Sequence, residues 1–176
     1  MRLFVAIGFD EKVRRYLSAV SEAAKAAAGS GNFSRSGLYH LTLAFLGETP
    51  PEKLPAAEEA VCESCGDPFL LELGGIGTFR REGGAVLWLG VSPSPGLTVL
   101  RKRLCVSLQN RQVPFEEGAF SPHITLARKA TLPGDRVKEL DARFRPIRTE
   151  VRRVSLMEST RPNGILTYTE RYGKEL

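Results

Sequence analysis

Apolar and polar residues along the chain follow two spacings in turn, one typical of strands and one typical of helices. The first predicted strand, Arg2–Phe9, carries an apolar run that is bounded by polar residues. From Glu11 to Ala28 the apolar residues recur at helical spacing instead. The same patterns predict further strands at Leu38–Leu46, Phe69–Leu73, Gly77–Arg80, Ala85–Val91, His123–Arg128, Glu150–Met157 and Leu166–Tyr172, and further helices at Glu52–Cys65, Pro95–Arg111 and Gly134–Arg143.

Part of the sequence occurs twice. HLTLAF begins at His40 and HITLAR begins at His123, an offset of 83 residues. The same offset places the first strand on the apolar run VLWLGV and the first helix on another helical pattern. We therefore predict an α+β fold with two pseudo-symmetric lobes, about 1–83 and 84–176, of mostly antiparallel sheet with helices outside and a central cleft. No linker-like break separates the halves, so 1–176 is expected to be a single domain.

Both histidines of the chain lie in the repeated motif, each followed by an apolar residue, a threonine and a leucine. Side chains on a strand alternate between its two faces, so His40 shares a face with Thr42, and His123 shares a face with Thr125. If the motif strands lie side by side, two imidazoles and two hydroxyls converge on one cleft. The alternative is a pair of ordinary strand histidines beside threonines chosen for β-sheet propensity. The symmetric placement of both histidines favours the first interpretation.

This combination of groups suits a phosphodiester. A neutral imidazole can take a proton from water while a protonated one donates to a leaving alkoxide. Two neighbouring imidazoles also disfavour double protonation of the pair. The threonine hydroxyls can donate to phosphate oxygens as charge develops. Two histidines without a carboxylate cluster make a poor metal site, so we expect neither a metal nor a cofactor.

Charge and cysteine content narrow the class of partner and the location. The formal net charge is +5, which favours anionic partners such as nucleic acid or phosphate esters. The three cysteines, Cys62, Cys65 and Cys105, are expected to be free thiols, because their number is odd and the C-x-x-C has no second pair for zinc. No signal-like or membrane-spanning apolar segment occurs, so we expect a cytoplasmic protein that does not bind membranes. We also expect the protein to be a monomer.

Several stretches, in order along the whole chain, resemble one known family. They are MRLFVAIGF, HLTLAFLGE, GGIGTF followed by VLWLGV, FSPHITLAR and VSLMESTRPNGILTYT. With the paired motifs, the sequence resembles the 2H phosphoesterase superfamily, and within it the RNA 2′,3′-cyclic phosphodiesterases once called 2′-5′ RNA ligases. One departure is Tyr39, where the family more often has a polar residue.

The resemblance implies a 2H phosphoesterase fold and hydrolysis of a terminal RNA 2′,3′-cyclic phosphate to a 2′-phosphate. It implies that His40 is the proton donor to the leaving 3′ oxygen and that His123 is the proton acceptor that activates water. Thr42 and Thr125 would hold the phosphate. The residues themselves treat the two histidines alike.

Arg128, at the end of HITLAR, is a further candidate for substrate binding. By strand alternation it faces away from His123, so it reaches a phosphate only if the strand bends. Loop cations and strand-flanking aromatics are additional candidates for RNA phosphates and bases, against surface or core roles: Arg35, Arg80 and Arg81, and Phe9, Phe45 and Phe120.

Two other functions fit the same residues. One is a 2H phosphodiesterase acting on a small cyclic nucleotide or a cyclic ADP-ribose phosphate, with reverse 2′-5′ ligation of RNA ends as a side reaction. The other is a non-catalytic module that binds RNA ends, which explains the positive charge but not the symmetric histidines.

Overall fold

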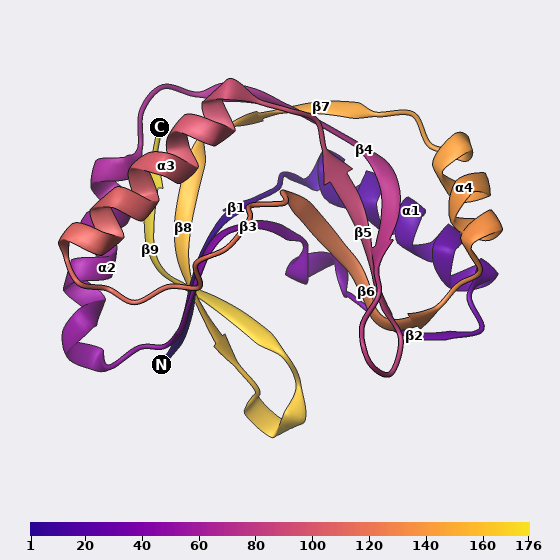
Figure 1. The fold of residues 1–176 in the computed structure, drawn as a ribbon, viewed down its shortest axis with the longest axis horizontal. Helices are drawn as coiled ribbons and strands as arrows, with labels where there is room; N and C mark the ends of the chain where they lie inside the picture. Colours follow the sequence, from indigo (N-terminus) through magenta and orange to yellow (C-terminus); the bar gives the residue numbers. More distant parts are fainter.

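The computed structural model describes residues 1–176, with nine strands and four α-helices. Figure 1 shows a strongly curved sheet with the helices outside it. The strands are β1 (Arg2–Gly8), β2 (Ser30–Phe33), β3 (His40–Glu48), β4 (Phe69–Phe79), β5 (Ala85–Val91), β6 (His123–Thr131), β7 (Ile147–Val151), β8 (Arg153–Thr160) and β9 (Thr167–Glu175). The helices are α1 (Glu11–Ala27), α2 (Leu54–Ser64), α3 (Pro95–Asn110) and α4 (Gly134–Arg143).

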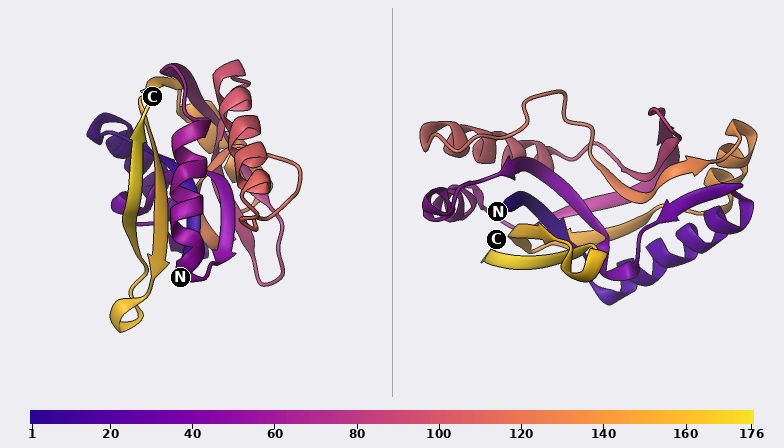
Figure 2. Two further views of the ribbon diagram at one scale, coloured as in Figure 1. Left: turned by 90° about the vertical axis from the view of Figure 1, so that its left-hand side faces the viewer. Right: turned by 90° about the horizontal axis from the view of Figure 1, so that it is seen from below.

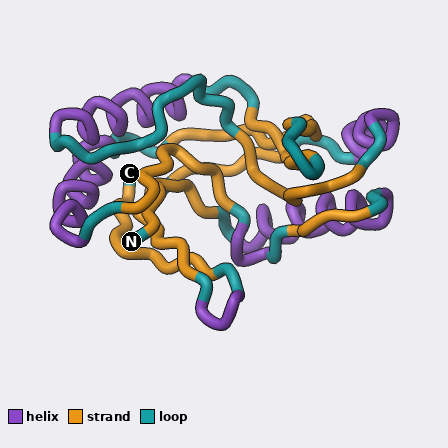
Figure 3. Tube along the Cα trace, turned by 60° about the horizontal axis from the view of Figure 1, so that its bottom comes forward, coloured by secondary structure: helices purple, strands orange, loops and turns teal.

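The strands form one antiparallel sheet in the order β7-β4-β5-β6-β3-β1-β8-β9, with β2 paired to β6. Four strands lie on each side of the contact between β6 and β3, and these two groups are the lobes. Figure 3 shows the strands as a continuous body with helices at its two ends. The predicted α+β fold, with pseudo-symmetric lobes and helices outside, is confirmed.

Each lobe contains strands from both halves of the sequence. β4 belongs to the first half but lies beside β5, because the two form a hairpin through the turn at 80–84. β8 and β9 belong to the second half but continue the sheet beyond β1. The division at residue 83 therefore describes the repeat in the sequence, while the lobes in space exchange strands.

Three of the strand predictions differ in kind from the structure, and the ends of several other strands shift by one to three residues. Residues 30–33, which lie outside every predicted helix and strand, form β2 against β6. The two strands expected at 69–80 are one strand, β4, with an irregular register around Gly75, whose φ is +79°. The single strand expected at 150–157 is two strands separated by Arg152. Before Arg152, β7 pairs with β4, and after it, β8 pairs with β1.

The helices pack in two pairs, α1 with α4 and α2 with α3, at opposite ends of the molecule (Figure 2). α1 illustrates how the sequence specifies this packing. Its N-terminus is capped by Asp10, whose carboxylate accepts a hydrogen bond from the backbone N of Val13 at 2.8 Å. Val13, Leu17, Val20 and Ala24 then recur every three or four positions and are buried.

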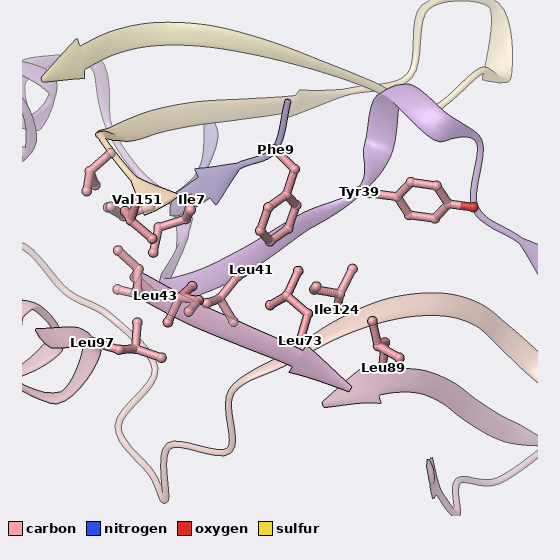
Figure 4. Packing of buried hydrophobic residues seen from close by; sticks show 14 of the residues in the cluster. Ile7, Phe9, Tyr39, Leu41, Leu43, Leu73, Leu89, Leu97, Ile124 and Val151 are labelled. Atoms are coloured by element: carbon pink, nitrogen blue, oxygen red, sulfur yellow. The ribbon is translucent and has the colours of Figure 1, made fainter. Parts of the chain in front are cut away.

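A single cluster of 34 buried residues forms the core. Leu41 of β3 and Ile124 of β6, which follow the two histidines, are fully buried in it. Figure 4 shows them meeting Leu73 and Leu89 from the neighbouring strands. The buried side chains on the core face of β3 and β6 thus hold both strands in place, with the histidines on the opposite face. None of the helices combines the length and the hydropathy that a membrane crossing requires.

Candidate active site

The two His-x-Thr motifs meet at the centre of the sheet. β3 and β6 begin at His40 and His123, and their pairing is confined to Leu41 and Ile124. Since antiparallel partners step in opposite directions from this pair, His40 lies opposite Thr125, and His123 lies opposite Thr42. The histidines are diagonal neighbours on one face, a relation in which residues are typically about 7–8 Å apart and their Cβ atoms somewhat closer. Beyond this short contact the strands separate.

Each imidazole is oriented by the same local hydrogen bond. Nδ1 of His40 lies 2.7 Å from the carbonyl oxygen of Leu38, and Nδ1 of His123 lies 2.8 Å from that of Ser121. A carbonyl oxygen only accepts, so in both rings Nδ1 carries the proton and donates it. Nε2 is therefore the atom of each ring that is left for proton transfer. The two rings therefore have the same tautomer, as the pseudo-symmetry of the lobes would suggest.

Both motif strands contain an extra residue at the same place in the repeat. Along β3 the register against β1 shifts by one residue after Thr42, and along β6 the register against β5 shifts after Thr125. A bulge of this kind reverses the alternation of faces beyond it. Two consecutive residues are buried as a result, Leu126 and Ala127 in β6.

The bulge corrects the expectation from strand alternation for Arg128. Its side chain is exposed and lines the same cavity as His40 and Thr125, instead of facing away from them. The equivalent position of the first repeat is Phe45, whose ring stacks on Phe4 at 6.4 Å. The two lobes thus differ at this point, with a cation in one and an aromatic ring in the other.

The environment of His40 favours its neutral form. Burial lowers the pKa of His40, the hydrogen bond to the carbonyl of Leu38 partly opposes this, and the charges of Arg128 and His123 lower the pKa further. Arg128 lines the same cavity as His40, which is why its charge bears on this ring. A phosphate anion between these groups would raise the pKa of His40, because it supplies the opposite charge.

Aromatic rings pack against each histidine. Phe4 and Tyr168 contact His40 at ring-centroid distances of 4.9 and 5.2 Å. Phe79 lies 5.0 Å from His123, and Trp88 lies 6.5 Å from it. Sequence reasoning missed these four residues, because each belongs to a strand whose neighbours in the sheet are not evident from the sequence. The sequence could have indicated them only by their alternate positions along apolar strands, close to the turns where these strands end.

Two cavities adjoin His40. The first, of about 710 Å³, is the cationic cavity, and its basic lining residues are Arg35, Arg128, Lys129 and Arg161. The second, of about 660 Å³, is the mixed cavity, and its charged lining residues are Asp10, Arg14, Glu150, Arg152, Arg153 and Glu170. Tyr168 lines both cavities.

The remaining candidate residues are distributed between site, core and surface. Arg35 lines the cationic cavity and donates from Nη2 to the carbonyl oxygen of Leu166 at 2.6 Å. Arg80 and Arg81 lie at the β4–β5 turn and line neither cavity. Phe9 and Tyr39 belong to the core and also line the mixed cavity. Phe120 packs on the Arg101 guanidinium at 5.4 Å.

No cluster of three or more His, Cys, Asp or Glu side chains is positioned to hold a metal ion. Cys62, Cys65 and Cys105 are free thiols, and the Sγ of Cys65 donates to the carbonyl of Val61 at the end of α2.

Comparison with known proteins agrees with this geometry. The RNA 2′,3′-cyclic phosphodiesterase of Thermotoga maritima is 34% identical over 165 residues, which are 91% of this chain and 87% of the relative. That of Geobacillus stearothermophilus is 32% identical over 129 residues, which are 72% of this chain but only 41% of the relative. The crystal structure of E. coli LigT in its apo form has a TM-score of 0.82 at 27% identity and covers 99% of this chain and 96% of LigT. Residues 10–163 match the model of the 2′-5′ RNA ligase superfamily, and the chain belongs to this superfamily of 2H phosphoesterases.

Proposed function

We propose that this chain is an RNA 2′,3′-cyclic phosphodiesterase, a hydrolase that opens a terminal cyclic phosphate to a 2′-phosphate. The observation that carries the proposal is the pair of matched imidazoles at the centre of the sheet. Both are held through Nδ1, so both keep Nε2 for proton transfer. The names of the relatives from Thermotoga maritima and Geobacillus stearothermophilus support the same activity.

The proposed reaction is a single displacement at phosphorus. Nε2 of His123 takes a proton from water, and the water oxygen forms a bond to phosphorus. The bond between phosphorus and the 3′ oxygen breaks, and that oxygen takes the proton from Nε2 of protonated His40. The product carries a 2′-phosphate and a 3′-hydroxyl, and proton exchange with solvent restores both rings. Each such proton transfer contributes typically about 10²–10⁴-fold to the rate.

The neighbouring groups support these roles. Thr42 and Thr125 lie opposite the histidines, where their hydroxyls can donate to the non-bridging oxygens. Arg128 supplies a positive charge to the phosphate and lowers the pKa of His40. Since the phosphate raises the pKa of His40, substrate binding itself favours the protonated ring that the reaction needs. The mechanism uses no metal and no cofactor.

An oligonucleotide ending in a 2′,3′-cyclic phosphate tests the proposal when it is incubated with the protein in EDTA. We expect hydrolysis to a 2′-phosphate, and His40→Asn and His123→Asn should each lower kcat by at least about 10²-fold. Glu52→Gln, at an exposed position before α2, is the control for handling and expression. Full turnover in either histidine variant, a 3′-phosphate product or a need for added metal would contradict the mechanism.

The same assay separates the alternatives. Turnover of a small cyclic nucleotide in preference to RNA would favour the small-molecule phosphodiesterase, and binding without turnover would favour a module for RNA ends. Joining of RNA ends through a 2′-5′ bond is the reverse reaction with the same groups. The proposal includes a cytoplasmic location and a monomeric state.

A further inference from the structure

The two cavities beside His40 differ in how their charges are compensated. In the mixed cavity, Arg152 pairs with Glu150 at 2.5 Å, and Arg153 pairs with Glu170 at 2.6 Å. In the cationic cavity, no carboxylate lies within 4.0 Å of Arg35, Arg128, Lys129 or Arg161, and no acidic residue contributes to the lining. The uncompensated positive charge is thus concentrated on one side of His40.

These cations come from three segments that the fold brings to the same cavity. Arg128 and Lys129 lie on β6 just beyond the bulge, and Lys129 has a φ of +52°. Arg161 lies at the tip of the β8–β9 hairpin, which projects from the body of the molecule in Figure 1. Arg35 ties the segment before β3 to this tip through the carbonyl of Leu166. The cavity is therefore a built feature of the fold.

Arg128 and Arg161 line the cavity together with Tyr168. Burial raises the pKa of Tyr168, and the charges of Arg128, Arg161 and Arg2 oppose that rise. Tyr168 also contacts His40. Arg161 thus lines the same cavity as Tyr168 and His40, although it lies far from either motif in the sequence.

The charge in the cavity exceeds what the reacting group needs. A 2′,3′-cyclic phosphate carries a single negative charge, and Arg128 together with the threonine hydroxyls is sufficient to neutralise and hold it. Arg35, Lys129 and Arg161 remain, and guanidinium and ammonium groups without carboxylate partners are suited to further phosphate groups. Ile165, 53% exposed at the rim, offers an apolar surface beside them.

We propose that the cationic cavity binds the phosphate ester on the 5′ oxygen of the terminal nucleotide. In RNA this is the last internucleotide phosphodiester, so the chain leaves the site between β2 and the β8–β9 hairpin tip and not across the mixed cavity. The inference rests on the proposed function, and it specifies the substrate as an RNA chain or a 5′-phosphorylated nucleotide. Arg161 and Lys129 are the residues that recognise this second phosphate.

Three substrates test this inference: adenosine 2′,3′-cyclic phosphate with a free 5′-hydroxyl, the same nucleotide with a 5′-phosphate, and a dinucleotide with a terminal cyclic phosphate. We expect kcat/KM to be at least about tenfold higher for the second and third substrates. Arg161→Gln and Lys129→Gln should each remove most of this gain through KM, so that kcat/KM falls much more for the second and third substrates than for the first. Arg152→Gln, in the mixed cavity, is the matched control and should change none of the three.

Binding measurements separate this inference from the proposed function. A dinucleotide ending in a 2′-phosphate requires no turnover, and its affinity should fall at least about tenfold in Arg161→Gln, with a shallower dependence on salt. If the protein hydrolyses none of the substrates but Arg161→Gln still weakens this binding, the proposed function fails and the cavity assignment stands. Equal kcat/KM for all three substrates would overturn the assignment. So would an unchanged affinity of Arg161→Gln and Lys129→Gln for the dinucleotide 2′-phosphate.

Discussion

Arg128 offers a test that distinguishes two effects of one side chain. Its charge lowers the pKa of His40, and in the proposed mechanism it also holds the cyclic phosphate. Hydrogen bonds to charged groups contribute about 1.5–3 kcal/mol, and the exposure of Arg128 places it at the low end of this range. Since 1.4 kcal/mol corresponds to a factor of ten, Arg128→Gln should lower kcat/KM for an oligonucleotide cyclic phosphate about tenfold.

The same substitution should move the pKa of His40 upward. With the positive charge removed, protonation of His40 costs less, so the ring stays protonated to a higher pH. Because protonated His40 is the proposed acid, the alkaline limb of the pH profile of kcat/KM should shift to higher pH while the maximum falls. A chain with only two histidines allows both rings to be followed by NMR titration, with His40→Asn assigning the signals.

Arg128→Lys is the matched control, because it keeps the charge but not the planar fork. Its His40 should titrate as in the unmodified protein, while kcat/KM falls less than in Arg128→Gln. The reasoning is refuted if Arg128→Gln keeps kcat/KM within about twofold and leaves the titration of His40 unchanged, since Arg128 would then act on neither the phosphate nor the ring.

Three further changes test other parts of the site. Gly77→Ala would place a Cβ 2.4 Å from the indole of Trp88, so we expect a loss of about 1–3 kcal/mol in unfolding free energy and altered emission of this single tryptophan; unchanged values of both would contradict the packing. Because folding lowers the pKa of His40, the unfolded chain binds more protons than the folded one as the pH falls below about 6.5. Thermal melts should therefore show that stability decreases over that range, and that it decreases less in His40→Asn. Thr125→Val should lower kcat/KM by about tenfold while Thr125→Ser retains most activity; equal losses in both would argue against a role for the hydroxyl.

The sequence predicted the types and order of most elements and the meeting of the two motifs. Local periodicity carries that information, since the apolar spacing of α1 or β1 is set by which side faces the core. The exchange of strands between lobes could not be predicted in this way. It depends on β7 pairing with β4 and on β8 pairing with β1, on the two sides of Arg152, and both are long-range choices. Trp88 and Tyr168 reach the histidines through these pairings, so they were missed.

The placement of Arg128, by contrast, was available from the sequence by a physical argument. Strict alternation from His123 would direct its guanidinium into the core beside Ile124, where no acid occurs in the motif to pair with it, and an unpaired buried charge is too costly to be retained. The two adjacent apolar residues Leu126 and Ala127 allow one extra residue to be buried, and the bulge is the low-energy solution. In the first repeat the residue just beyond the same bulge is Phe45, which is half-buried against Phe4, instead of a cation. The repeated motif alone leaves the two histidines alike, and the residue that stands just beyond each bulge makes their surroundings different.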